Sequence, residues 1–195
     1  MAVFDFKKQY KELYLPKTIP SVIEVPEMSF IAVRGKGDPN EEGGEYKCAV
    51  SMLYGIAYTL KMSRKAGHDI KGFYDYAVPP LEGFWHQSDI HNGKDSFQWI
   101  SVIRLPEFVT ENDFRWALDT ASAKKKTDFS KAEYLTIEEG LTVQCMHIGS
   151  YDTEPETISA MRDYAESQGY YEDFQLQECT MKFILMIPAE QIPKS

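Results

Sequence analysis

The feature that most constrains the fold of this chain is a repeated order of predicted secondary-structure elements. Two segments each read strand, turn, helix, glycine, strand, strand, and each ends with an aliphatic residue followed by proline. The first segment contains the predicted strands 30–34, 73–78 and 97–105 and the helix 45–66. The second contains the predicted strands 141–148, 173–177 and 181–187 and the helix 154–167. Residue identity between the segments is slight, so the repetition lies in the order of the elements.

Both helices of the repeat show helical apolar spacing and recognisable ends. In the first helix the apolar positions are Tyr46, Ala49, Val50, Leu53, Ile56, Ala57 and Leu60. Gly67 follows this helix, and Thr153-Glu154-Pro155-Glu156 predicts a capping box at the start of the second helix. A further helix, from Glu111 to about Ala123 with Thr110 as its cap, is predicted between the two segments.

A single unit of three strands and one helix buries too little apolar surface to fold alone. Two such units can join edge to edge, with both helices on one face of the sheet and a ligand groove on the other. The sequence therefore predicts an α+β fold of duplicated β-α-β-β units that form an antiparallel sheet. We expect residues 1–195 to form a single domain, with repeats over about 29–106 and 140–188 and an N-terminal strap over 1–28.

Charge and cysteine content limit the function classes. The formal net charge is -9, which disfavours nucleic acid as a direct partner and suits a cationic or neutral ligand. Three cysteines without a C-x-x-C pair indicate a reducing compartment. Neither a signal peptide nor an apolar run of about 18 residues is apparent, so we expect a cytoplasmic protein without membrane contact. The sequence leaves the oligomeric state open.

Aromatic residues make up 13% of the chain and supply most of the candidate binding residues. Tyrosine and tryptophan carry polar groups that need partners, so an excess of them suggests a ligand-facing surface. Glu82 follows a double proline and precedes Gly83-Phe84-Trp85. This pattern suggests an acid beside a rigid aromatic wall, able to pair with a cation or act as a base, and the alternative is a solvated loop glutamate.

Further aromatic candidates lie on predicted strands and on the helix after Thr110. Tyr74 and Tyr76 alternate onto one face of the predicted strand 73–78, and we assign that face to the pocket. Trp85 and Trp99 are either stacking walls or core residues. Trp116 lies off the apolar stripe of its helix, so it covers the pocket rim or contacts a partner.

The histidines favour structural roles over metal binding. His147 lies in a predicted strand beside Met146, where a hydrogen-bonded structural histidine is the usual outcome and a catalytic one the alternative. His86, Asp89 and His91 do not have the spacing of a common metal site, so no metal is expected.

Four stretches of the chain resemble the GyrI-like small-molecule-binding family, and most closely its stand-alone bacterial members of about this length. They are residues 54–62, 76–85, 108–110 and 143–155, which read YGIAYTLKM, YAVPPLEGFW, FVT and VQCMHIGSYDTEP. The resemblance extends from about Lys7 to Pro188. It implies a duplicated β-α-β-β fold that binds small hydrophobic, often cationic or planar, compounds in a groove between the repeats.

The resemblance also implies a role in drug or xenobiotic protection. Some stand-alone members are similar to hydrolases that open the cyclopropane ring of DNA-alkylating natural products. Glu172 is the best match to the family's pocket glutamate, with Glu178 and Glu82 as the other candidate catalytic acids. The family's usual His-His-Glu-Ile-Tyr-Leu pattern reads Tyr-Tyr-Glu-Asp-Phe-Gln-Leu over 170–176, so binding ranks ahead of catalysis.

The predicted strands, the aromatic residues and the family resemblance together give a set of expected ligand contacts. Two functions other than small-molecule binding stay open. The expected contacts are Tyr74, Tyr76, Phe84, Trp85, Trp99, Trp116, Met146, His147, Tyr151 and Tyr171. One alternative is a protein-interaction module that modulates a partner such as a topoisomerase. Another is tetrapyrrole binding with His147 as a ligand, although the leading hypothesis involves no cofactor.

Overall fold

The computed structural model describes residues 3–87, 97–150 and 153–170. These residues fold into two compact units, and each unit is described by itself. The first contains the residues up to Phe6 together with Glu27–Ile137, and the second contains Lys7–Pro26 together with the residues from Glu138 onward.

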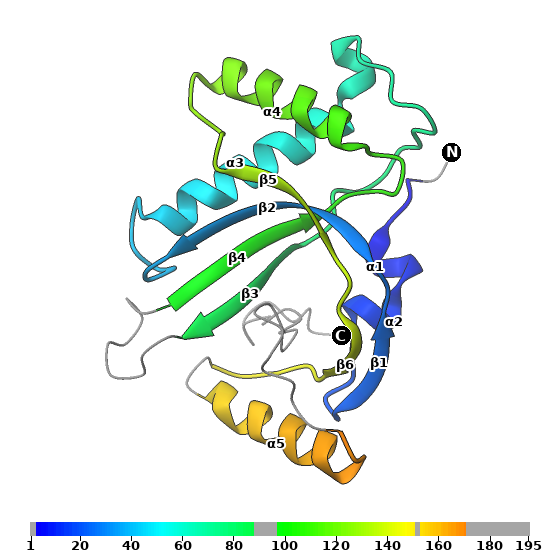
Figure 1. Ribbon diagram of the computed structural model, residues 1–195, viewed down its shortest axis with the longest axis vertical. Coiled ribbons are helices and arrows are strands. Elements are labelled where there is room, and N and C mark those ends of the chain that lie inside the picture. Colours follow the sequence, from blue (N-terminus) through cyan, green and yellow to red (C-terminus); the bar gives the residue numbers. More distant parts are fainter. Residues whose placement is uncertain (1–2, 88–96, 151–152, 171–195) are drawn as a thin grey trace, which may run out of the picture. The chain divides into compact units, whose positions relative to one another are not determined.

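The first unit is built on a four-stranded antiparallel sheet with the strand order β3-β4-β2-β5 (Figure 1). Its strands are β2 (Met28–Lys36), β3 (Leu81–Gln87), β4 (Phe97–Arg104) and β5 (Ala132–Ile137). Isoleucine, valine and aromatic residues supply most of the apolar positions of β2 and β4, which suits strands at the centre of a sheet.

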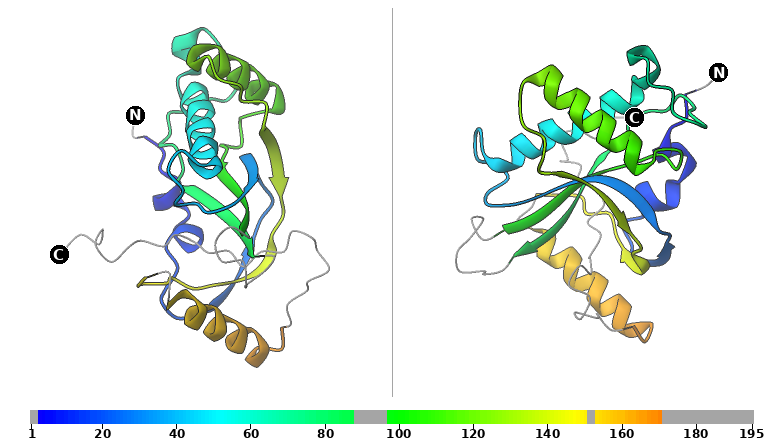
Figure 2. Two further views of the ribbon diagram at one scale, coloured as in Figure 1. Left: turned by 90° about the vertical axis from the view of Figure 1, so that its left-hand side faces the viewer. Right: turned by 45° about the horizontal axis from the view of Figure 1, so that its top comes forward.

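Two helices lie side by side on one face of this sheet (Figure 2). They are α3 (Glu45–Lys61), which is followed by the short 3-10 helix η1 (Ser63–Ala66), and α4 (Glu111–Lys125). A capping box begins α4, because the Asp113 N–H donates to the Thr110 hydroxyl and the Thr110 N–H donates to the Asp113 carboxylate. Gly67, with a left-handed φ of 79°, ends η1.

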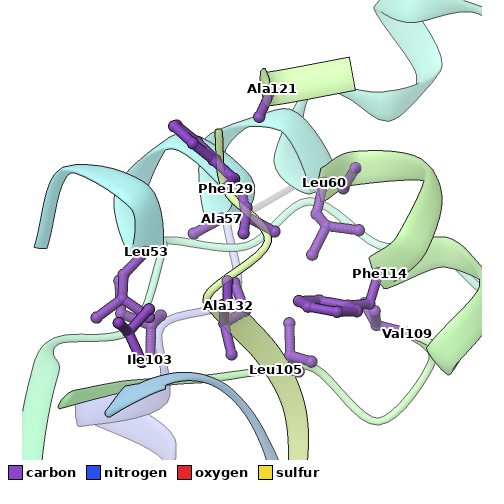
Figure 3. Packing of buried hydrophobic residues seen from close by; sticks show 14 of the residues in the cluster. Leu53, Ala57, Leu60, Ile103, Leu105, Val109, Phe114, Ala121, Phe129 and Ala132 are labelled. Carbon is purple, nitrogen blue, oxygen red and sulfur yellow. The ribbon is translucent and has the colours of Figure 1, made fainter. Parts of the chain in front are cut away.

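The core of the first unit lies between these helices and the sheet (Figure 3). Its members come from all three layers: Leu53, Ala57 and Leu60 from α3, Phe114 and Ala121 from α4, and Ile103 and Ala132 from the strands. Leu53 and Leu60 are 0% exposed, so truncating either to alanine costs about 2–5 kcal/mol. The helix-facing side of the sheet is therefore occupied by protein.

The second unit contains a two-stranded antiparallel sheet and three helices. Its elements are α1 (Phe6–Gln9, which starts in the first unit), α2 (Lys11–Tyr14), β1 (Ser21–Val25), β6 (Gly140–Gln144) and α5 (Glu154–Ser167). The Gln144 side-chain amide donates to the Glu12 carbonyl at 2.9 Å, and the Met146 N–H donates to the Lys17 carbonyl at 2.9 Å. The N-terminal segment thus contributes a strand and backbone hydrogen bonds to this unit.

The predicted α+β class with antiparallel strands is confirmed. The order β2-α3-β3-β4 reproduces the β-α-β-β pattern of the first segment. The helices predicted over 111–123 and 154–167 are present as α4 and α5, but the capping box predicted at Thr153 is wrong, since the Thr153 side chain makes no cap hydrogen bond. The helix predicted over 45–66 is divided, since its α-helical part ends at Lys61 and η1 follows.

The predicted strand 73–78 is wrong. Tyr76 forms only an isolated bridge with Phe4, and the strand of this region is β3, which begins after the double proline. The alternating aromatic residues pack locally instead, because Phe73, Tyr74 and Tyr76 all place their rings 4.8–5.8 Å from the ring of Phe108.

The strand pattern differs from the prediction at three further places. β1 and β5 are not predicted from the sequence, and the strand predicted over 141–148 ends at Gln144. The strands predicted over 173–177 and 181–187 lie outside the described residues.

Candidate functional site

The face of the four-stranded sheet opposite α3 and α4, here the distal face, is the main candidate for ligand binding. Core residues fix the orientation of each strand: Ile31 of β2, Trp99 and Ile103 of β4, and Leu81 of β3 belong to the cluster beneath the helices. Successive side chains of a strand point to opposite faces, and directly opposed residues of an antiparallel pair share a face. The strand register therefore assigns the residues of the distal face.

The register arranges the distal face in rows that cross the sheet. One row consists of Glu82 in β3, Val102 in β4, Ala32 in β2 and Glu133 in β5. The next row consists of Phe84, Ile100 and Arg34. The predicted residues Glu82 and Phe84 thus lie on the same face, with Ile100 opposite Phe84.

The distal face has an apolar centre with an acid at each end of its first row. Ala32 and Val102 are 0% exposed, whereas Glu82, Phe84 and Ile100 are partly buried. Ala32 and Val102 are therefore enclosed by protein, and ligand contacts on this face would fall on Glu82, Phe84 and Ile100. Ile100 was missed by the sequence reasoning, although its alternation with Trp99 placed it on the other face.

Glu82 combines a charged group with an apolar setting. Its Oε1 atom is closed to solvent, and on the face it lies directly opposite Val102 and two residues from Phe84 along the strand, with Arg104 two residues beyond Val102. A charge in such a setting interacts more strongly with an opposite charge than it would in water, because the effective dielectric constant is lower. The residue can therefore bind a cationic group or accept a proton from a bound molecule.

The arginines of the distal face are held in ion pairs. Arg34 donates from Nε to Glu133 Oε1 at 2.6 Å. Arg104 donates from Nη2 to Glu107 Oε1 at 2.9 Å, and its guanidinium carbon lies 5.0 Å from the ring centroid of Phe6. These pairs offset the positive charge of the face. The sequence held no signal for Glu133, because β5 is not predicted.

Trp85 and Trp99 lie on the helix-facing side of the sheet, opposite to Glu82 and Phe84. They are directly opposed across β3 and β4, and Tyr46 of α3 lies 5.3 Å from the Trp85 ring and 5.1 Å from the Trp99 ring. Trp99 is 2% exposed. The indole rings therefore support the sheet from the helix side, and Trp85 does not share a face with Glu82 and Phe84.

Tyr74 and Tyr76 belong to an aromatic cluster with Phe4, Phe6 and Phe108 and do not share a strand face. Tyr76 is 2% exposed, and burial raises the pKa of its hydroxyl well above the usual value. The Tyr74 hydroxyl donates to Glu107 Oε2 at 3.2 Å. Tyr76 is enclosed by protein, whereas Tyr74 is only partly buried.

Trp116 stacks on His68 near the beginning of α4. The ring centroids are 4.0 Å apart with an interplanar angle of 9°, and His68 Nε2 lies 2.8 Å from Asp113 Oδ1. Burial raises the pKa of Asp113, but hydrogen bonds from Thr110 and His68 outweigh it, so that this pKa lies below its usual value. The contacts of Trp116 therefore connect it to the capping box of α4.

His147 and Met146 lie in the second unit, next to the beginning of α5. His147 Nδ1 is 2.7 Å from the Thr157 hydroxyl, and its Nε2 is 3.0 Å from the Ser150 carbonyl oxygen. Both ring nitrogens thus have hydrogen-bond partners, which is typical of a structural histidine. A tetrapyrrole ligand at His147 would have to displace one of these partners.

Four expected site residues, Tyr151, Tyr171, Glu172 and Glu178, lie outside the described residues. Among the residues that the structure does describe, no three His, Cys, Asp or Glu side chains are grouped so that they could hold a metal ion. In the same part of the chain, no helix has the length and apolar character needed to cross a membrane.

Comparison with known proteins places these features in a family. A family model described as a GyrI-like small molecule binding domain matches residues 19–191. A search of curated proteins gave no match.

Three solved structures from Listeria innocua resemble the chain over most of its length. A hydrolase is 44% identical with a TM-score of 0.78, covering 85% of this chain and 81% of the other. An uncharacterized conserved protein is 44% identical with a TM-score of 0.78, covering 85% and 82%. A further structure, also described as a hydrolase, is 38% identical with a TM-score of 0.80, covering 93% and 96%. Since the family model spans nearly the whole chain and these structures share its fold, the chain belongs to the GyrI-like family of small-molecule-binding domains.

Proposed function

We propose that this GyrI-like domain binds a small hydrophobic compound, cationic or planar, on the distal face of β3 and β4, and that binding protects the cell from such compounds. The observation that carries the proposal is the position of Glu82, which shares one sheet face with Phe84 and Ile100. The partly buried side chains supply an apolar surface for a flat molecule, and the carboxylate supplies the charge that orients it.

The preference for a cation follows from charge. The chain has a formal net charge of -9, and both arginines of the distal face are paired with acids. A carboxylate with one oxygen closed to solvent attracts a cation across a low-dielectric contact. Stacking of a planar cation on the Phe84 ring would add to this attraction.

We further propose hydrolysis of a strained electrophile, such as a cyclopropane conjugated to an electron acceptor, as the enzymatic form of this function. Two similar structures are described as hydrolases, which supports this form. Glu82 would accept a proton from water while the water oxygen bonds to a ring carbon. The ring C–C bond would break, its electron pair would pass to the conjugated acceptor, and a proton would be taken up there. Glu172 and Glu178 stay predicted alternatives to Glu82 as the base.

Binding can be tested with two ligands that share one ring system. At neutral pH 9-aminoacridine is a planar cation and acridine is neutral, and isothermal titration calorimetry measures the Kd of each. Glu82→Gln keeps the shape of the side chain and removes its charge. The affinity for 9-aminoacridine should fall by about tenfold or more, because a charge-assisted contact is worth about 1.5–3 kcal/mol. Acridine binding should change by less than about twofold, because it lacks the charge.

Glu24→Gln is the matched control, because Glu24 is an exposed acid on β1 in the other unit and its loss changes the net charge equally. Equal weakening by the two substitutions would mean that only overall charge matters, and the proposal would be wrong. Turnover is tested separately. The protein is incubated with a cyclopropane-bearing alkylator in ¹⁸O-labelled water, and mass spectrometry measures the mass of the product. Tight binding without ¹⁸O incorporation would remove the enzymatic form and leave the binding function.

A further inference from the structure

A concave surface lies in the first unit, in the groove between α3 and α4. Its volume is about 430 Å³, and its lining includes Tyr54, Tyr58, Met62, Thr120, Lys124 and Lys125. The two helices lie next to each other (Figure 1). Gly55 and Ala121 form part of its lining, and the absence of a side chain at Gly55 admits the Phe129 ring, which would lie 2.8 Å from a Cβ atom there. The groove is separate from the distal face, since the sheet's core lies between them.

One side of the groove is aromatic and exposed to solvent. The rings of Tyr54 and Tyr58 are stacked with centroids 6.2 Å apart and an interplanar angle of 29°. Tyr58 is 51% exposed and the neighbouring Met62 is 42% exposed. Tyr54 is held by a hydrogen bond from the backbone of Leu81, and burial raises the pKa of its hydroxyl. A fixed ring beside exposed apolar side chains offers a contact surface for a flat apolar molecule.

The charge of the groove is opposite to that of the whole chain. Its lining contains two lysines and no acid, although the chain carries a formal net charge of -9. The Lys125 ammonium is 3.1 Å from the Ser51 hydroxyl, so this side chain is held over the groove. Lys124 is exposed and forms no ion pair with any residue that the structure describes. A second copy of this chain would bring its own lysines to the same place, so like charges oppose self-association here.

We propose that the α3–α4 groove binds a small aromatic carboxylate, with its ring against Tyr58 and Met62 and its carboxylate at Lys124. The volume lies within the roughly 300–1,000 Å³ range of small-molecule sites. This site goes beyond the function proposed for the distal face, because it has another location and the opposite ligand charge.

The probes are 2-naphthoate and 2-naphthamide, which share a ring system and differ in charge. We expect 2-naphthoate to bind more tightly than the amide in calorimetric titrations. Lys124→Gln should lower the affinity for 2-naphthoate by about two- to fivefold, as expected for an exposed ion pair, and leave the affinity for the amide unchanged. Tyr58→Ala should weaken both probes by about five- to tenfold, because both lose the ring contact. Thr120→Phe fills the groove and should abolish binding of both.

Two controls separate this site from general charge and from the distal face. Lys126→Gln changes the net charge equally just beyond the end of α4, at a residue that does not line the groove, and should leave 2-naphthoate affinity unchanged. Glu82→Gln should likewise leave it unchanged. Equal affinity for acid and amide, or equal weakening by Lys124→Gln and Lys126→Gln, would overturn the proposal. Loss of 2-naphthoate binding in Glu82→Gln would also overturn it, because the probe would then occupy the distal face.

Discussion

Gly35 is the position at which the packing beneath the sheet of the candidate site can be tested most sharply. A Cβ atom at residue 35 would lie 2.3 Å from both Cη2 and Cζ2 of Trp99, whereas an ordinary contact begins at 3.4 Å. Residue 35 is directly opposite Trp99 in the register of β2 and β4. Gly35→Ala therefore forces the indole ring to withdraw by roughly 1 Å in a core where side chains are closely packed.

The size of the effect follows from what surrounds the ring. Trp99 is 2% exposed, and Tyr46 packs edge-on against it at 5.1 Å, so the ring cannot move without displacing its neighbours. Overpacking of this kind costs about 1–3 kcal/mol. Replacing glycine by alanine in a strand stabilises the fold by about 0.5–1 kcal/mol, because the unfolded chain becomes less flexible. We expect a net loss of about 1–2 kcal/mol in the free energy of unfolding.

Urea unfolding followed by circular dichroism measures this loss, and a second substitution identifies its cause. Trp99→Phe removes both atoms that the new Cβ would meet, so Gly35→Ala in the Trp99→Phe background should cost nothing or stabilise. The coupling between the two substitutions should reach about 1 kcal/mol or more. A neutral Gly35→Ala variant with Trp99 intact, or strictly additive effects, would refute this account of the packing.

Three further outcomes follow from the described contacts. Thr110→Ala removes the capping hydroxyl of α4 and should lower stability by about 1 kcal/mol in thermal unfolding, whereas Thr110→Ser should retain most of it. The pKa of Asp113 is lowered in the folded protein, so its hydrogen bond with His68 and its cap stabilise the fold at neutral pH and are lost as the pH falls through and below 3.8. Asp113→Asn should therefore be less stable than wild type at pH 7, with a difference that shrinks in acid; a pH-independent difference would contradict this. Lys131→Ala breaks an exposed ion pair with Glu45 and should lower the free energy of unfolding only slightly, and a larger loss at high salt would be inconsistent with a surface pair.

The helices were predictable because their signals are local. The apolar spacing of α3 and the threonine cap of α4 lie within the elements that they specify, and the structure confirms both. β4 was predictable for the same reason, since it is a run of β-branched and aromatic residues that ends before a proline.

The strands that were missed depend on distant partners. β5 alternates charged and apolar residues weakly, and it becomes a strand because it pairs with β2, more than 90 residues earlier. The aromatic residues from Phe73 to Tyr76 alternate like a strand but pack against Phe108, a contact that no local pattern reveals. Tertiary packing therefore decided these two segments.

The candidate site was predictable in its residue types and not in its geometry. The sequence identified Glu82 and its aromatic neighbours, but placing them requires knowing which face of β3 packs against the helices. That assignment depends on Leu81 and Trp85 joining the core with α3, which leaves Glu82 and Phe84 on the distal face. A shift of one residue would have reversed it, because side chains alternate along a strand.

Photo-crosslinking tests the central claim, that the distal face binds the ligand, most directly. A diazirine derivative of 9-aminoacridine is irradiated with the protein, and peptide mass spectrometry locates the labelled residues. The account predicts labels in β3 and β4 (Leu81–Gln87 and Phe97–Arg104), competed by unmodified 9-aminoacridine and reduced in Glu82→Gln. Competed labels confined to α3 and α4, or to peptides that lack both strands, would contradict it.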